Sequence, residues 1–175
     1  QTKILKMKKF SLLFLFSLLF WAGKSQDFSH IALDNRIYTD DIYSVKLCPA
    51  DKYFGTPIIK LNSGEQLRLV FDHLGDYDEY MKYTLIHCSH DWQLSPMNPL
   101  EYLDGFMEDE ITDNSYSFNT ITGYTHFELL LPNDLLRITK SGNYILFVYD
   151  ETPENPILTQ RFMVVESTTA GIVGT

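Results

Sequence analysis

The sequence lacks an excess of basic residues. It has 14 lysine and arginine residues against 23 aspartate and glutamate residues, and its formal net charge is −9. A protein that binds nucleic acid needs a basic surface to neutralise phosphates, so this charge argues against nucleic acid as a partner. The 175 residues, of which 45% are hydrophobic, suffice for one domain with a sizeable core.

The short motifs on which common enzyme classes depend are also missing. The sequence has no glycine-rich phosphate loop, no G-x-S-x-G elbow and no H-E-x-x-H pair. Residues 87–91 (HCSHD) do contain potential metal ligands, and Cys88 and His90 could be a hydrolase nucleophile and base. On a strand, however, His87 and Cys88 point to opposite faces, and no second cluster completes a zinc site. The sequence therefore predicts a protein that is not an enzyme and uses no cofactor.

A second cluster, formed by Asp72, Asp76, Asp78 and Glu79, offers hard oxygen ligands of the kind that calcium prefers. Its spacing does not match an EF-hand loop. Aspartate is common in exposed turns, so we interpret this segment as a solvated turn.

Long hydrophobic runs are scarce, and the one near the start is short. Residues 10–22 (FSLLFLFSLLFWA) follow Lys8 and Lys9 and contain no charge. Basic residues followed by a short uncharged apolar run are typical of a secretory signal peptide. The run is too short to be a transmembrane helix. We expect residues 1–25 to be removed before Gln26 and residues upstream of Met7 to precede the true start. Five lysines are lost with that segment, which leaves nine basic against 23 acidic residues and a mature charge of −14.

The rest of the chain is patterned as short strands. Alternating or continuous apolar stretches cover residues 43–47, 59–61, 67–71, 80–88, 124–131, 144–149 and 157–165. We expect residues 59–71 to form a hairpin and residues 80–88 to form a central strand covered on both faces. The pattern predicts an all-β fold, an antiparallel immunoglobulin-like β-sandwich of about seven to eight strands. This domain would occupy residues 26–166, followed by a linker or truncated end at 167–175.

One connection, residues 89–114, exceeds the roughly 12 to 15 residues beyond which loops are usually functional or disordered. Its large apolar side chains, including Trp92, Tyr102, Leu103 and Phe106, are interleaved with acidic ones. Two interpretations remain open. The apolar residues either cap the open end of the sandwich or bind a partner.

The sequence has only two cysteines, Cys48 and Cys88. An even number in an exported chain is compatible with one disulfide bond. Two buried free thiols are the alternative, since unpaired cysteines are common in cores.

A series of ordered segments carries a family resemblance. They are residues 57–67 (PIIKLNSGEQL), 83–92 (YTLIHCSHDW), 101–106 (EYLDGF), 111–113 (ITD), 115–120 (SYSFNT), 124–126 (YTH), 131–134 (LPND), 139–144 (TKSGNY) and 161–166 (RFMVVE). Together they resemble the N-terminal domain of the type IX secretion system plug protein family, from about Ile42 to Glu166.

The resemblance implies a non-enzymatic periplasmic protein that closes the periplasmic mouth of the outer-membrane translocon barrel. It would be peripheral to the membrane, would not span it, and would bind neither nucleic acid nor a small-molecule substrate. Members of the family are considerably longer than this chain. From the apolar and acidic composition of the connection over residues 89–114, we expect the partner interface to include Trp92, Tyr102, Leu103 and Phe106, because aromatic anchors dominate interface energetics.

An alternative function from another class is a secreted carbohydrate-binding module. Exported β-sandwiches commonly bind glycans by stacking sugars on exposed aromatic rings. The 11 tyrosines and two tryptophans of the sequence are compatible with this function, with Trp92 as the expected stacking residue.

Overall fold

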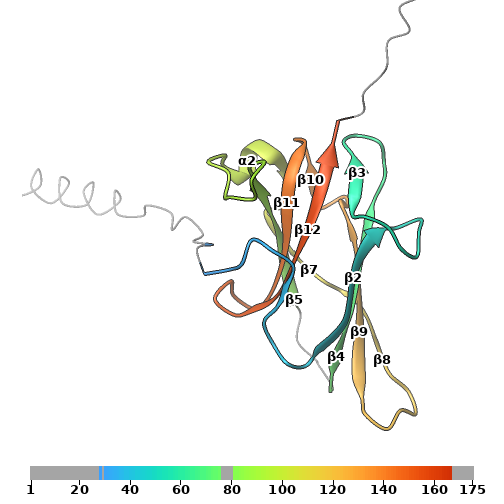
Figure 1. Cartoon of the computed structure of the whole chain (residues 1–175). Helices are drawn as coiled ribbons and strands as arrows, with labels where there is room; N and C mark the ends of the chain where they lie inside the picture. The colour runs from blue at the N-terminus through green and yellow to red at the C-terminus, as the bar shows by residue number, and fades with distance from the viewer. Residues whose placement is uncertain (1–27, 29, 76–80, 167–175) are drawn as a thin grey trace, which may run out of the picture.

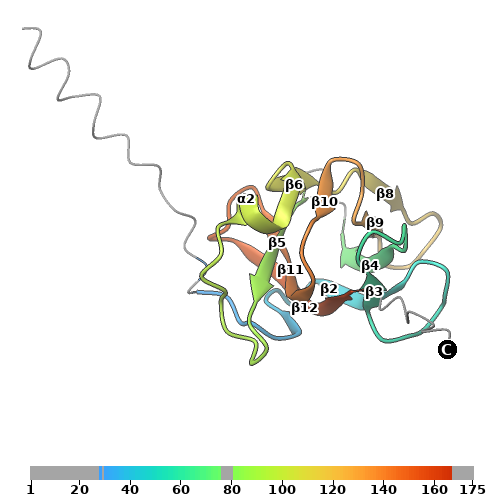
Figure 2. The same ribbon diagram turned by 90° about the horizontal axis from the view of Figure 1, so that it is seen from above.

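The computed structural model describes residue 28 and residues 30–75 and 81–166 of the chain. They form twelve strands and one short helix, which are arranged as two facing sheets and a small third sheet at one end (Figure 1 and Figure 2). The elements are β1 (Arg36–Ile37), β2 (Ile42–Pro49), β3 (Ile58–Lys60), β4 (Leu67–Leu74), β5 (Met81–Cys88), α2 (Pro99–Tyr102), β6 (Leu103–Gly105), β7 (Glu108–Glu110), β8 (Asp113–Tyr116), β9 (Tyr124–Leu131), β10 (Leu136–Ile138), β11 (Gly142–Asp150) and β12 (Pro156–Val165).

The larger sheet has six strands in the order β1-β12-β11-β5-β7, with β3 also paired to β12. The second sheet has the order β2-β4-β9-β8, and the small sheet joins β10 to β6. The predicted all-β fold of packed antiparallel sheets is therefore confirmed. The described part of the chain has more strands than expected, because short strands form within connections that the sequence pattern leaves as loops.

The predicted hairpin over residues 59–71 is wrong. β3 pairs in parallel with β12, while β4 lies between β2 and β9 in the opposite sheet. The intervening turn is closed by its own hydrogen bonds: the Lys60 amide donates to the Glu65 carboxylate at 2.9 Å, and the Ser63 hydroxyl donates to the Lys60 carbonyl at 2.7 Å. Alternation of apolar residues predicts a strand but not its partner, so the sequence could not distinguish a hairpin from a crossover.

The central position of β5 and β11 follows from their continuous apolar sequences. Successive side chains on a strand face opposite sides, so a strand that is apolar at every position needs cover on both. Tyr144 and Leu146 of β11 face the main core, whereas Ile145 and Phe147 belong to a second hydrophobic cluster. The side chains of β5 are likewise shared between the two clusters, which confirms the prediction that this strand is covered on both faces.

The main core lies between the two large sheets. Phe71 and Phe127, which are opposite each other in β4 and β9, stack with ring centroids 5.1 Å apart. The fully buried side chains around this pair come from both sheets: Leu67, Leu69, Met81, Tyr83, Leu85, Leu131, Tyr144, Leu146 and Phe162.

The second cluster covers the outer face of the larger sheet. Phe28, Ile31 and Leu33, from the segment before β1, pack against Phe147 and its neighbours on that face. Arg161 of β12 holds this segment by donating two hydrogen bonds to the Leu33 carbonyl, at 2.9 and 2.6 Å. The N-terminal segment is thus part of the domain.

The predicted long loop over residues 89–114 is partly structured. It contains α2, β6 and β7. Asn98 caps the helix: its side chain accepts a hydrogen bond from the Leu100 amide at 3.0 Å, and Glu101 accepts one from the Asn98 amide at 2.8 Å. This reciprocal capping box satisfies backbone groups at the start of the four-residue helix, which the buried Tyr102 anchors to the core.

The predicted signal peptide (residues 1–25), its cleavage site and the predicted C-terminal linker (residues 167–175) lie outside the described residues. Within the described residues, no helix has the length and the hydropathy needed to cross a bilayer.

Candidate partner-binding surfaces

Two of the four predicted interface residues are buried. Tyr102 and Leu103, which end α2 and begin β6, belong to the main core. The Tyr102 ring lies 5.5 Å from the His87 ring and 5.9 Å from the Tyr144 ring, measured between centroids. These side chains close one end of the sandwich, in agreement with the capping interpretation of the sequence.

Trp92 is half-buried and lies over the second hydrophobic cluster. The Arg161 guanidinium lies over its ring, 4.4 Å from the centroid. A cation in this position occupies the ring face that a sugar or a partner would otherwise contact. Trp92 therefore packs against the domain and offers little free ring surface.

Phe106 is the one predicted interface residue with a largely free side chain, which is 60% exposed. It follows Gly105, whose φ of +105° suits glycine. A β-carbon at Gly105 would lie only 2.2 Å from the Leu135 carbonyl oxygen. The glycine is thus required for β6 to lie against β10, and beside it Asp104 pairs with Arg137 at 2.8 Å. These contacts give the EYLDGF segment a structural role.

The HCSHD stretch does not assemble a reactive centre. His87 packs among the rings of Tyr102 and Tyr144, whereas Cys88 faces the opposite side, in the second cluster. Burial raises the pKa of the Cys88 thiol to about 11, so the thiolate that a hydrolase needs is disfavoured. Ser89 donates a hydrogen bond to Asp91 within the loop itself. The described residues contain no group of three or more His, Cys, Asp or Glu side chains arranged to hold a metal ion.

The two cysteines lie in different sheets and are both buried and free. Cys48 donates a hydrogen bond to the Lys52 carbonyl at 3.4 Å. The disulfide bond considered from the sequence is therefore not formed in this structure, and the alternative of two buried thiols describes it.

The predicted acidic turn is only partly described. Asp72 lies on β4 and pairs with His126 of β9, with 2.6 Å between the carboxylate oxygen and Nδ1. Asp76, Asp78 and Glu79 lie outside the described residues. Asp72 is thus already engaged within its sheet.

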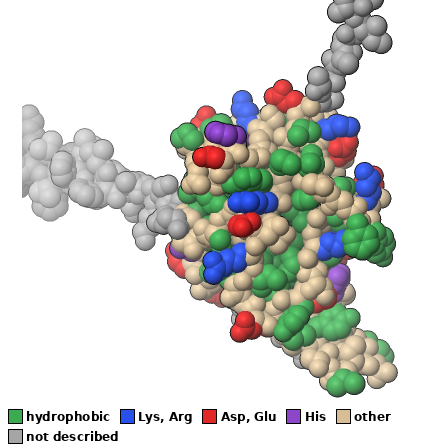
Figure 3. Space-filling view, in the orientation of Figure 1, with side chains coloured by type: hydrophobic (Ala, Val, Ile, Leu, Met, Phe, Trp, Pro, Cys, Tyr) green, Lys and Arg blue, Asp and Glu red, His purple; other side chains and the backbone are tan. Residues whose placement is uncertain are grey.

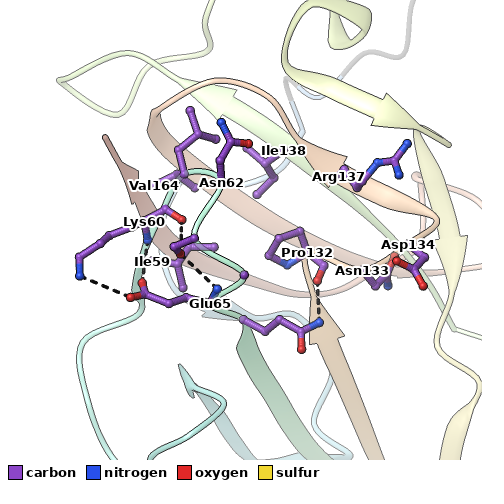
Figure 4. Close-up of a pocket in the computed structure, with 14 residues that line it drawn as sticks. Ile59, Lys60, Asn62, Glu65, Pro132, Asn133, Asp134, Arg137, Ile138 and Val164 are labelled. Atoms are coloured by element: carbon purple, nitrogen blue, oxygen red, sulfur yellow. Dashed lines mark hydrogen bonds and ion pairs between the residues drawn. The ribbon is translucent and has the colours of Figure 1, made fainter. Parts of the chain in front are cut away.

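One pocket, of about 350 Å³, lies between the β3–β4 turn and the β9–β10 turn (Figure 4). Ile59, Ile138 and Val164 contribute apolar walls. Of its polar lining, Lys60 is paired with Glu65 at 3.5 Å, and the Ser63 hydroxyl is hydrogen-bonded within its own turn. These groups stabilise the turn, so the pocket lacks the pairing of nucleophile and base that hydrolysis needs.

The most exposed large hydrophobic side chains of the described residues lie elsewhere, on the turn between β8 and β9. We call residues 116–124 the β8–β9 tip. Phe118 is 94% exposed and Ile121 is fully exposed. The hairpin projects at the end of the molecule opposite α2, and hydrophobic side chains are visible on that projection (Figure 1 and Figure 3).

A second exposed aromatic pair, Tyr53 and Phe54, lies on the connection from β2 to β3, and their side chains are 78% and 79% exposed. The Lys46 ammonium lies over both rings, 4.8 Å from the Tyr53 centroid and 4.2 Å from the Phe54 centroid. The two rings are tilted by 49°. They do not form a flat platform for a sugar ring.

The sequence pattern does not mark the β8–β9 tip as a surface, although part of the tip falls in a segment that carries the family resemblance. A signal was present. Residues 114–127 contain no Asp, Glu, Lys or Arg, in a chain whose net charge is −9. An uncharged stretch with alternating strand character predicts a buried strand pair equally well, and only the structure places its turn in solvent.

Comparisons with known proteins agree with the fold and identify a family. A family model described as the type 9 secretion system plug protein first domain matches residues 42–166. Among solved structures, the chain is similar to the crystal structure of a hypothetical protein from Parabacteroides merdae ATCC 43184, with 35% identity and a TM-score of 0.74. The similarity covers 78% of this chain and 34% of that chain, so this chain spans about a third of that protein. No curated protein matches the chain.

Proposed function

Because this chain belongs to the type 9 secretion system plug protein family, we propose that it is part of the stopper that closes the periplasmic mouth of the outer-membrane translocon barrel. The observation that carries the proposal is the match to the family's first domain over residues 42–166. That match covers every strand of the two large sheets except β1, from the first residue of β2 to the residue after β12.

The physical character of the domain supports a stopper that works by shape. Two hydrophobic clusters, one on each side of the larger sheet, give the body a packed interior and resist deformation. We propose a non-enzymatic protein without cofactor, since His87 and Cys88 pack on opposite faces of β5 and Ser89 is hydrogen-bonded within its own loop.

Location and finer topology complete the proposal. The protein would act in the periplasm after cleavage of the signal peptide predicted over residues 1–25, associated with the outer membrane but not spanning it. We further propose that the strand connectivity is immunoglobulin-like, as the sequence predicts; the two facing, mainly antiparallel sheets support this assignment.

Copurification from native cells tests the function. The full-length protein would carry an affinity tag and be recovered from detergent-solubilised outer membranes, because this chain spans only about a third of its solved relative. We expect mass spectrometry to identify the very large barrel protein of the secretion system. Recovery of the tagged protein alone, from membranes shown to contain the barrel, would overturn the proposal.

The carbohydrate-binding alternative would then need separate support. Its expected stacking residue, Trp92, is covered by Arg161, and the exposed rings of Tyr53 and Phe54 are tilted and share Lys46. Binding to a glycan array by the isolated protein would favour that alternative.

A further inference from the structure

We propose that the β8–β9 tip is the element that inserts into the partner protein, with Phe118 and Ile121 entering an apolar pocket on that partner. The inference rests on the proposed function, because it takes the translocon barrel as the partner. It differs from the interface expected from the sequence, which lies at the opposite end of the molecule, near α2.

The exposure of these two residues has no explanation within the fold. A hydrophobic side chain contributes to stability only when it is removed from water, and Phe118 and Ile121 have the two largest exposed fractions of the large hydrophobic residues described. Tyr116, at the end of β8, is also 54% exposed. Apolar side chains gathered at a projecting tip mark an interaction site more often than scattered ones do.

The tip is closed by hydrogen bonds across the turn and by one to the residue that follows β4. The Tyr124 amide donates to the Ser117 hydroxyl at 2.9 Å, and the Thr120 hydroxyl donates to the Thr122 carbonyl at 2.8 Å. At the base of the turn, the Gly75 amide donates to the Gly123 carbonyl at 2.8 Å. A binding element that is already ordered loses little conformational entropy on binding, so this turn is preorganised for insertion.

The charge pattern favours an apolar pocket on a protein. Residues 114–127 carry no Asp, Glu, Lys or Arg, whereas the chain as a whole has a net charge of −9. The tip therefore approaches a partner with no charged group of its own to desolvate. A narrow projecting hairpin also fits a concave site better than a flat surface.

A lipid surface suits these observations less well. Two apolar side chains bury less hydrocarbon than a single fatty-acyl chain, which by itself gives only marginal and reversible membrane binding. The acidic body is repelled by anionic headgroups. In a protein pocket, by contrast, two well-packed anchors can carry most of the binding energy.

The other exposed aromatic residues are weaker candidates because charged groups lie near them. Lys46 lies over Tyr53 and Phe54, so burial of those rings would also desolvate its charge. Phe106 lies close in sequence to the exposed Asp104–Arg137 ion pair. Among the described residues, the tip alone combines full exposure of large hydrophobic side chains with an uncharged surrounding sequence.

The test compares two variants of the full-length protein in copurification with the barrel. In the double variant Phe118→Ser with Ile121→Ser, the anchors are removed. Phe54→Ser is the matched control, because Phe54 is also a largely exposed aromatic on a connecting loop. Both variants should fold like wild type, which circular dichroism and the thermal unfolding midpoint would verify, since none of these residues belongs to a hydrophobic cluster.

We expect the amount of barrel protein that copurifies with the double variant to be reduced by about tenfold or more relative to wild type. The amount that copurifies with Phe54→Ser should equal that of wild type. Equal retention by the double variant and wild type would overturn the inference while leaving the proposed function intact. Failure of wild type itself to retain the barrel would instead contradict the proposed function.

A crosslinking experiment identifies what the tip touches. Cys48 and Cys88 are both buried, so Phe118→Cys introduces an exposed thiol into the described residues, to which a benzophenone crosslinker can be attached. We expect a crosslink to the barrel protein from position 118, and none from the matched Phe54→Cys variant. A crosslink from position 118 to lipid, or to no partner while copurification persists, would contradict the inference.

Discussion

At the scale of single residues, Gly142 is constrained by the histidine beside it. Its φ is +150°, and a β-carbon there would lie 2.3 Å from Nε2 of His87, whose ring is packed against Tyr144 with centroids 5.0 Å apart. Gly142→Ala should lower the free energy of unfolding by about 2–4 kcal/mol, because backbone strain and displacement of a packed ring add together. Urea denaturation measures this loss.

Gly64→Ala is the matched control for that substitution. Gly64 also has a positive φ, +77°, but nothing lies within 4 Å of the position of its β-carbon. It should therefore show only the conformational cost, about 1 kcal/mol. Equal losses in the two variants would show that the contact with His87 has no energetic consequence.

The burial of His87 also predicts that the stability of the domain depends on pH. Burial lowers its pKa below the usual 6.5, and a hydrogen bond with the Ser141 carbonyl only partly opposes this shift. The unfolded chain therefore binds a proton near pH 6.5 that the folded chain does not, so stability falls as the pH drops from neutrality through the folded pKa. His87→Gln should make this decline shallower in urea titrations between about pH 7.5 and pH 5.

An NMR titration of the imidazole provides the independent check on this assignment. A His87 pKa equal to or higher than that of a model histidine would contradict the account. So would identical pH slopes for wild type and His87→Gln.

At the scale of elements, Arg161 of β12 is the charged side chain that contacts the N-terminal segment most extensively. Arg161 donates two hydrogen bonds to the Leu33 carbonyl, lies 3.4 Å from the Asp34 carboxylate and covers the Trp92 ring. Arg161→Ala should reduce stability by about 2–3 kcal/mol, since hydrogen bonds to a charged group and a cation–π contact are lost together. Amide hydrogen exchange should accelerate over residues 30–38 in particular.

Arg137→Ala is the control at the same scale. Arg137 pairs with Asp104 at 2.8 Å, but both side chains are more than half exposed. Exposed ion pairs contribute about 1 kcal/mol or less, so this variant should be nearly as stable as wild type. Unchanged exchange over residues 30–38 in Arg161→Ala would show that the Arg161 side chain is not needed to hold the segment, which also pairs with β12 through β1.

Most of the elements could be predicted from the sequence because their apolar patterns are strong. The continuous run over residues 144–149 indicates a strand buried on both faces, and β11 is one. Pairing was predicted less well. β3 is only three residues long, and its parallel partner, β12, lies a hundred residues further along the chain. No local pattern encodes a contact at that separation.

At the scale of the whole molecule, the candidate site was predicted less well than the fold. Large apolar residues in the connection over 89–114 indicated a cap and a partner surface with equal force, and burial of Tyr102 and Leu103 distinguishes the two only in the structure. The β8–β9 tip could not be predicted as a surface because its residue types are equally suited to a core. Phe118 and Ile121 have the chemistry of core residues, and their exposure depends on where the sandwich ends.

The central proposal is that the full-length protein closes a pore, and ion conductance tests it most directly. The purified translocon barrel would be reconstituted in a planar bilayer and the full-length protein added to the periplasmic side. The account predicts that wild-type protein closes the open pore and that the Phe118→Ser, Ile121→Ser variant does so only at about tenfold higher concentration. A conductance that wild-type protein leaves unchanged at saturating concentration would contradict the account.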